Sequence, residues 1–217
     1  MKLKHPFFEN EDEKYFGISQ TWSLDNRIRK WGCGASAAVM VIAYLGFYHD
    51  HDIDVDLSKN LQTKNELADI LDSIGASSIP IIPHIGINGI ILSLSLNTFF
   101  IKNRMPYRAS WVSGWDRIIK CTGEMLKNDI PVILSVGPDF PLFFKKHPIG
   151  LYQPSDMKKP ARTVSGHYMV AVEMSDKFIR VSSWGKEYYI SIEEWRKHHK
   201  LFSGGITDGI VAIRKQK

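Results

Sequence analysis

The feature that most constrains this chain is an apolar run, residues 33–46, that opens with a cysteine between two glycines. From Cys33 to Gly46 it contains no proline and no charged residue. Small and apolar side chains at every position are typical of a helix that is buried on all sides. Gly46 is the expected stop signal of this helix. The rest of the chain is expected to pack around it.

Cys33 stands at the predicted start of that helix. A helix N-terminus has unpaired N–H groups and the positive end of the dipole, so a thiol in the first turn is expected to lose its proton easily. Gly32 and Gly34 are expected to leave the surroundings of the sulfur open to a substrate backbone. The alternative is that Cys33 is a small apolar side chain at a helix start, as many unpaired cysteines are.

His167 is the candidate base for this thiol. It follows Gly166 and begins an apolar run rich in β-branched residues, 168–172, which predicts a buried strand. The other histidines lie in polar or irregular stretches. A nucleophile and its base need not be close in sequence, because the fold brings them together. A core histidine with satisfied hydrogen bonds is the alternative.

Three motifs of this sequence resemble those of the papain-like cysteine peptidases, and most closely the branch with the bacterial double-glycine leader peptidases. The motifs are Gly32-Cys33-Gly34-Ala35-Ser36-Ala37, Gly166-His167-Tyr168-Met169-Val170 and Val181-Ser182-Ser183-Trp184-Gly185. The resemblance covers roughly residues 15–213. It implies a papain-like α+β fold, with the nucleophile helix packed on a C-terminal antiparallel sheet. It also implies that Cys33 is the nucleophile and that His167 is general base and then general acid.

The resemblance further implies a residue that orients the imidazole and a side chain that helps to bind the oxyanion. The family uses Asn or Asp as the orienting residue, whereas the matching positions here are Ser182 and Ser183. A hydroxyl accepts a hydrogen bond from an imidazole but adds no negative charge, so slower catalysis or its loss would follow. For the oxyanion, Gln20 has the family's residue type but lies thirteen residues before Cys33, and Asn26 is closer to the usual spacing.

The expected activity is hydrolysis of a peptide or amide bond through an acyl-enzyme on Cys33, with no cofactor and no metal. The substrate cleft is expected beside the two catalytic positions, lined by Trp31, Gly32, Gly34, Gly166 and Trp184. Two alternatives have the same fold. One is a papain-like domain that has lost peptidase activity and binds a peptide or a partner in the cleft. The other is an acyltransferase that passes the acyl group to an amine.

Composition favours one domain over residues 1–217, with residues 1–14 as a lead-in segment. A chain of 217 residues that is 44% hydrophobic can bury a full core. Its net charge of +5 is spread along the sequence, which argues against nucleic-acid binding. Two cysteines do not form a disulfide framework. The oligomeric state is left open.

The N-terminal sequence predicts a cytoplasmic protein, because acidic residues follow the first basic ones and no apolar signal-peptide core is present. Residues 77–101 have no charged side chain, but prolines and glycines interrupt them, so no membrane-spanning helix is expected. The alternating acidic residues in 49–56 are interpreted as a solvated loop, with a metal site as the alternative.

Periodicity and capping signals predict most of the remaining elements. A capping box at Thr63 opens an amphipathic helix that runs to Ile74. Residues 23–32 and 137–165 are expected to be loops. The loop 137–165 is expected to cover the cleft. Helices are also expected over residues 116–127 and 191–195, and strands over 130–136, 168–172, 178–181, 188–190 and 210–213. Residues 87–103 fit a strand by the alternation of Leu92, Leu94 and Leu96 with polar residues and a helix by their length, and the resemblance to papain-like domains favours the helix.

Overall fold

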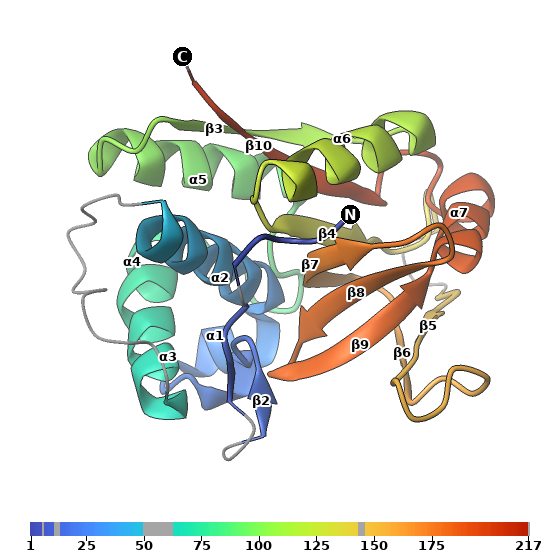
Figure 1. Ribbon diagram of the computed structural model, residues 1–217, viewed down its shortest axis with the longest axis horizontal. Helices are drawn as coiled ribbons and strands as arrows, with labels where there is room; N and C mark the ends of the chain where they lie inside the picture. The colour runs from blue at the N-terminus through green and yellow to red at the C-terminus, as the bar shows by residue number, and fades with distance from the viewer. Residues whose placement is uncertain (6, 11–13, 50–62, 143–145, 217) are drawn as a thin grey trace.

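The computed structural model describes residues 1–217 except 6, 11–13, 50–62, 143–145 and 217 (Figure 1). Most of the acidic segment 49–56 therefore lies outside the described residues, and so does the question of a metal site there. In the described part of the chain, six strands form one antiparallel sheet. In sheet order they are β3 (Tyr107–Val112), β10 (Gly209–Lys215), β4 (Val132–Val136), β7 (His167–Met174), β8 (Phe178–Ser183) and β9 (Lys186–Ser191).

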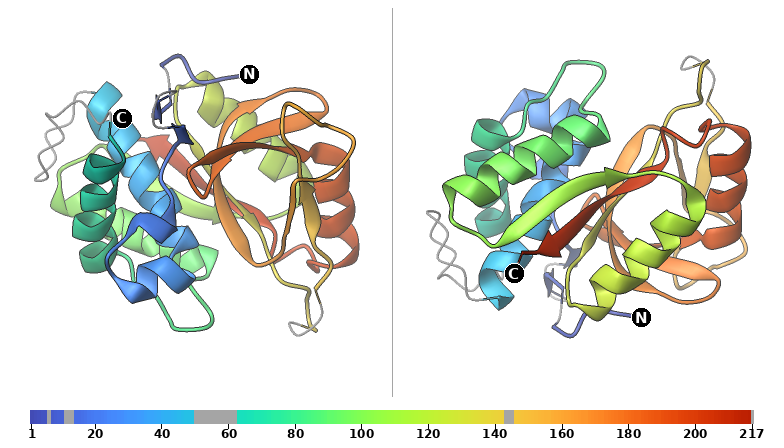
Figure 2. Two further views of the ribbon diagram at one scale, coloured as in Figure 1. Left: turned by 90° about the horizontal axis from the view of Figure 1, so that it is seen from below. Right: turned by 90° about the horizontal axis from the view of Figure 1, so that it is seen from above.

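Helices and the sheet pack against each other around one continuous apolar core. The helices are α1 (Asn26–Trp31), α2 (Cys33–Tyr48), α3 (Lys64–Ile70), α4 (Ala76–Ser78), α5 (Gly89–Lys102), α6 (Trp115–Lys127) and α7 (Ile192–Leu201). Helices α1 to α4 gather on one side of the molecule, and β7, β8 and β9 with α7 lie on the other (Figures 1 and 2). The prediction of an α+β chain with an antiparallel sheet is confirmed.

Helix α2 is the buried helix that the sequence predicted. Every residue from Gly34 to Leu45 is buried, so the helix has no solvent face. It does not stop at Gly46 but continues to Tyr48, where the His49 N–H closes the last turn on the Leu45 carbonyl. A glycine inside a helix costs only about 1 kcal/mol, and the packing of the flanking turns outweighs that here.

Residues 23–32 are mostly helical, and the predicted loop is therefore wrong there. Asp25 caps α1 by accepting a hydrogen bond from the Arg27 N–H, and Ile28 anchors the helix in the core. The charged residues of this stretch lie on its exposed face. Before it, Gln20–Trp22 forms a 3-10 turn, η1, which follows the short paired strands β1 (Glu9–Asn10) and β2 (Tyr15–Phe16).

Several elements that local sequence patterns predict are present in the structure. The capping box at Thr63 opens α3, which continues through a π-helical turn, η2 (Leu71–Gly75), into α4. Residues 89–102 form the helix α5, with Asn88 as its cap, so the helix and not the strand is correct for this segment. Strand β3 was not predicted, and the long loop 137–165 contains a small hairpin of β5 (Ile149–Leu151) and β6 (Arg162–Val164). None of the helices in the described residues is both long and apolar enough to cross a membrane.

Asp129, in the turn between α6 and β4, ties together parts of the chain that are distant in sequence. It is buried and has a φ of 60°. Its carboxylate accepts hydrogen bonds from the Lys4 N–H (2.6 Å) and the Tyr44 hydroxyl (2.8 Å), and lies 2.6 Å from His5 Nδ1 and 3.3 Å from His49 Nε2. Burial alone would raise the pKa of Asp129, but these partners outweigh it and lower the pKa to about 2.

We predict that Asp129→Asn lowers the free energy of unfolding at neutral pH by about 2–3 kcal/mol. The wild-type advantage is fully present above pH 3.8, the usual value of an aspartate, and is lost as the pH falls towards about 2. Urea unfolding of both proteins between pH 2 and pH 7 measures this difference. The exposed Asp69 on α3 is the matched control, and Asp69→Asn should change stability little. An equal loss in both variants would contradict the prediction.

Candidate active site

Cys33 lies at the junction of α1 and α2, and the glycines on either side of it are buried. A Cβ on Gly32 would come within 2.5 Å of the Ile28 carbonyl oxygen, so only glycine allows the tight passage from one helix to the next. A Cβ on Gly34 would meet the Ile87 side chain at 2.5 Å and the Tyr168 ring at 3.3 Å. Both glycines therefore allow the close approach of neighbouring protein atoms, and the open space expected beside the sulfur for a substrate stays a prediction.

The Cys33 sulfur lies beside β7. The backbone of Tyr168, Gly34 and Cys33 itself favours the thiolate and acts to lower the pKa of Cys33. Burial of the sulfur has the larger effect and raises the pKa of the Cys33 thiol above its usual value. The sequence-based expectation of an easily ionised thiol is therefore not met, because desolvation exceeds the effect of the helix N-terminus.

His167 opens β7, as predicted, and pairs with Val136 of β4. Its Nε2 lies 2.7 Å from the Ser183 hydroxyl. Burial, together with the positive charge of Arg162, lowers the pKa of His167 to about 3, so the imidazole is neutral at physiological pH. Among the described residues, Nδ1 has no hydrogen-bond partner, and no hydrogen bond joins the imidazole to the Cys33 sulfur.

The structure distinguishes the two serines that the sequence left open. Successive residues of a strand point to opposite faces, so Ser182 and Ser183 cannot both reach the imidazole. Ser183 faces His167, whereas the Ser182 hydroxyl donates a hydrogen bond to the Phe16 carbonyl at 2.8 Å. Ser182 thus attaches the N-terminal segment to the sheet, and its candidacy as the orienting residue is not supported by its contacts.

Trp184 covers the imidazole. Its ring stacks on that of His167, with centroids 4.2 Å apart and an angle of 16° between the planes. Trp184 and Gly185, with φ values of 50° and 68°, form the two-residue turn between β8 and β9. Gly166, before the histidine, has a φ of 66° and is exposed, with no atom near the position of a Cβ. Trp184 and Gly166 are the predicted cleft residues that lie directly beside His167.

Of the two side chains expected to help bind the oxyanion, Gln20 stays a candidate and Asn26 does not. Gln20 is buried in η1, and its Nε2 donates one hydrogen bond to the Arg29 carbonyl (3.1 Å), which leaves its second N–H without a partner among the described residues. Asn26 is exposed, and its side-chain oxygen accepts a hydrogen bond from Arg29 (2.6 Å). No contact of Asn26 connects it to Cys33.

Segment η1 lies against the turn formed by Trp184 and Gly185. A Cβ on Gly185 would come within 2.7 Å of the Trp22 ring and 3.4 Å of Ser19. On the other side of Cys33, the half-buried Trp31 packs against the His84 ring at 4.8 Å. The backbone of Trp31 also lies close to Gly86. Segments distant in sequence therefore surround the junction of α1 and α2.

Compared with models of protein families and with curated proteins, the sequence matches none.

Sequence reasoning missed two residues of this site. The backbone of Tyr168 acts to lower the pKa of Cys33, and its ring packs against Gly34. Its place directly after the candidate base was the available signal. Arg162 lies on the far side of Trp184, with its guanidinium carbon 5.0 Å from the ring centroid. No motif marks Arg162, because the hairpin of β5 and β6 that positions it lies in a stretch without a clear period.

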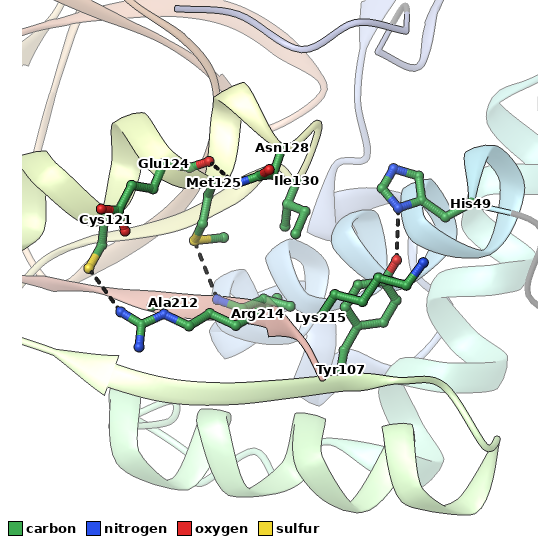
Figure 3. A pocket seen from close by; sticks show the side chains of 11 residues that line it. His49, Tyr107, Cys121, Glu124, Met125, Asn128, Ile130, Ala212, Arg214 and Lys215 are labelled. Carbon is green, nitrogen blue, oxygen red and sulfur yellow. Dashed lines mark hydrogen bonds between the residues drawn. The ribbon is translucent and has the colours of Figure 1, made fainter. Parts of the chain in front are cut away.

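A separate cavity of about 450 Å³ lies between α6 and β10 (Figure 3). Its lining includes Cys121, whose sulfur lies 3.6 Å from an Arg214 guanidinium nitrogen, and no residue of the candidate site. Within the described residues, no three His, Cys, Asp or Glu side chains are placed to share a metal ion.

We predict that Cys33 alkylates with an apparent pKa above the value of about 8.5 of a free thiol. His167→Ala should not raise this apparent pKa further, because the neutral imidazole gives the thiolate no charge partner. Iodoacetamide labelling between pH 5 and pH 10, with Cys33 and Cys121 followed separately by peptide mass spectrometry, measures both values. An apparent pKa below about 7 that rises in His167→Ala would instead reveal a preformed ion pair.

Proposed function

We propose that this chain is a papain-like cysteine hydrolase that cleaves a peptide or amide bond. The observation that carries the proposal is the placement of Cys33 at the start of α2, which packs through Gly34 against the ring of Tyr168, the residue directly after His167. The same histidine is held by Ser183 at Nε2 and by the Trp184 ring, which leaves Nδ1 as the nitrogen able to take a proton. A thiol, a neutral imidazole and a fixed ring orientation are what nucleophilic catalysis by cysteine requires.

In the proposed reaction both catalytic groups start neutral. The Cys33 sulfur attacks the carbonyl carbon of the substrate while Nδ1 of His167 accepts the thiol proton. The oxyanion that forms is stabilised by the backbone N–H of Cys33 and by the second N–H of Gln20. The tetrahedral intermediate then collapses, the C–N bond breaks, and the imidazolium returns its proton to the leaving amine. Cys33 is left as a thioester.

Hydrolysis of the thioester repeats these steps with water as the nucleophile. His167 takes a proton from the water as its oxygen attacks the thioester carbonyl. The carboxylic acid product leaves, and the proton returns to the Cys33 sulfur. Ser183 and the Trp184 ring keep the imidazole in one orientation through both halves of the reaction. Because a hydroxyl has no negative charge, it stabilises the imidazolium less than a carboxylate would, and we expect a slow enzyme.

The test is digestion of a mixed peptide library, with new N-termini identified by mass spectrometry. Wild type and Cys121→Ala should give the same cleavage products, whereas Cys33→Ala and His167→Ala should give none above background. Thioester trapping with hydroxylamine should yield peptide hydroxamates only when Cys33 is present. Specific peptide binding by all four proteins without any cleavage would contradict hydrolysis, and would favour a peptide-binding domain that has lost catalysis.

The neighbouring serines offer a matched pair of variants. We predict that Ser183→Ala lowers kcat/KM by about 10- to 30-fold, the effect of one lost orienting hydrogen bond of about 1.4–2 kcal/mol. Ser182→Ala should leave kcat/KM nearly unchanged but lower the free energy of unfolding by about 1–2 kcal/mol, because the Phe16 carbonyl loses its partner. Peptide cleavage rates and urea unfolding separate the two effects. The reverse assignment of effects would contradict the roles given to these residues.

A further inference from the structure

Arg162, Trp184 and His167 form a stack that ends in a positive charge. The Trp184 ring lies between the imidazole, 4.2 Å away, and the Arg162 guanidinium, 5.0 Å away. Arg162 is the first residue of β6, the strand that leads through Gly166 into β7. The guanidinium is therefore positioned by the same short segment that delivers the candidate base.

The Arg162 guanidinium is available to a ligand. The side chain is exposed, and no carboxylate in the described part of the chain forms an ion pair with it. Arg180, on neighbouring β8, contrasts with it, because its guanidinium is bound by the Glu187 carboxylate at 2.9 Å. An arginine whose guanidinium is held over an indole loses less side-chain entropy when it binds a carboxylate.

The direction of proton transfer in the proposed reaction indicates which part of a substrate lies near the Arg162 guanidinium. His167 has to give its proton to the leaving amine, so the part of the substrate beyond the cleaved bond lies on the histidine side of the sulfur. Trp184 covers the imidazole, and Arg162 lies beyond Trp184. The first residues after the cleaved bond therefore run towards the guanidinium.

We propose that Arg162 is a specificity residue that binds a carboxylate on the leaving-group side of the substrate, so that the preferred substrates are peptides with an acidic group just after the cleaved bond. This inference rests on the proposed function, because it uses the direction in which a substrate crosses Cys33 and His167. The carboxylate is that of an acidic side chain or of a free C-terminus, and both make the same paired hydrogen bonds to a guanidinium.

The positive charge of Arg162 also acts on the pKa of His167. Arg162 lowers the pKa of His167, which makes the imidazole a weaker base. A carboxylate bound to the guanidinium would offset that charge and raise the pKa of His167 towards its usual value. An acidic substrate would therefore strengthen the base that acts on it, whereas a neutral one would not.

Binding of leaving-group fragments to Cys33→Ala tests the proposal without requiring turnover. The probes are the dipeptide amides alanyl-glutamic acid, alanyl-glutamine and alanyl-lysine, followed by ligand-observed NMR. Alanyl-alanine with a free and with an amidated C-terminus distinguishes a side-chain carboxylate from a terminal one. We expect one carboxylate-bearing probe to bind at least about fivefold more tightly than its neutral counterpart, with the difference shrinking at high salt.

Variants of the arginine supply the decisive comparison. In the Cys33→Ala background, Arg162→Gln should abolish the preference for the carboxylate, and Arg162→Glu should transfer it to alanyl-lysine amide. Arg117→Gln, which removes an exposed charge from α6, is the matched control and should keep the wild-type preference. Equal binding of charged and neutral probes, a preference that survives Arg162→Gln, or no probe binding up to about 10 mM would overturn the proposal.

The proposed function can fail separately. If the peptide library is not cleaved but Arg162 governs carboxylate binding, the anion site stands and hydrolysis does not. If wild type cleaves the library and the residues after the cut show no enrichment in acidic groups, with the same pattern in Arg162→Glu, hydrolysis stands and the role of Arg162 is wrong.

Discussion

The contact between the start of α2 and β7 is the constraint on which the rest of the structure depends. A Cβ on Gly34 would lie only 3.3 Å from the Tyr168 ring, so the helix packs closely on this strand. The contact brings Cys33, the residue before Gly34, next to the strand that His167 opens. Because α2 is buried along nearly its whole length, it cannot shift to accommodate changes at that contact without disturbing the core.

Burial has opposite consequences for the two catalytic candidates. It raises the pKa of the Cys33 thiol and lowers the pKa of His167, so both groups are held in their uncharged forms. A serine in place of a carboxylate agrees with this environment, because a neutral imidazole needs a hydrogen-bond partner but no counter-charge. In the proposed reaction the charge develops only after the substrate has bound, and a bound substrate that excludes water would strengthen every interaction with it.

The sequence predicted what local patterns encode. The apolar run identified α2, the capping box at Thr63 identified α3, and the α+β class followed from the order of the elements. Prediction from the sequence failed where a few contacts decide the local structure or the charge of a side chain. One cap at Asp25 turns an expected loop into α1, and desolvation, which a sequence does not display, reverses the expected pKa of Cys33. The choice between Ser182 and Ser183 depends on strand register, which pairing with β7 and β9 fixes. The papain-like family and its activity stay proposals.

The turn formed by Trp184 and Gly185 gives this site an unusual sensitivity to chain length. Adjacent serines of β8 face opposite sides of the sheet, one towards the imidazole and the other towards the N-terminal segment. A one-residue shift of β8 against β7 would exchange these two roles, and a change in the length of the turn would displace the indole from the imidazole. The spacing from Ser182 to Lys186 is therefore constrained twice, by the pair of serines and by the indole.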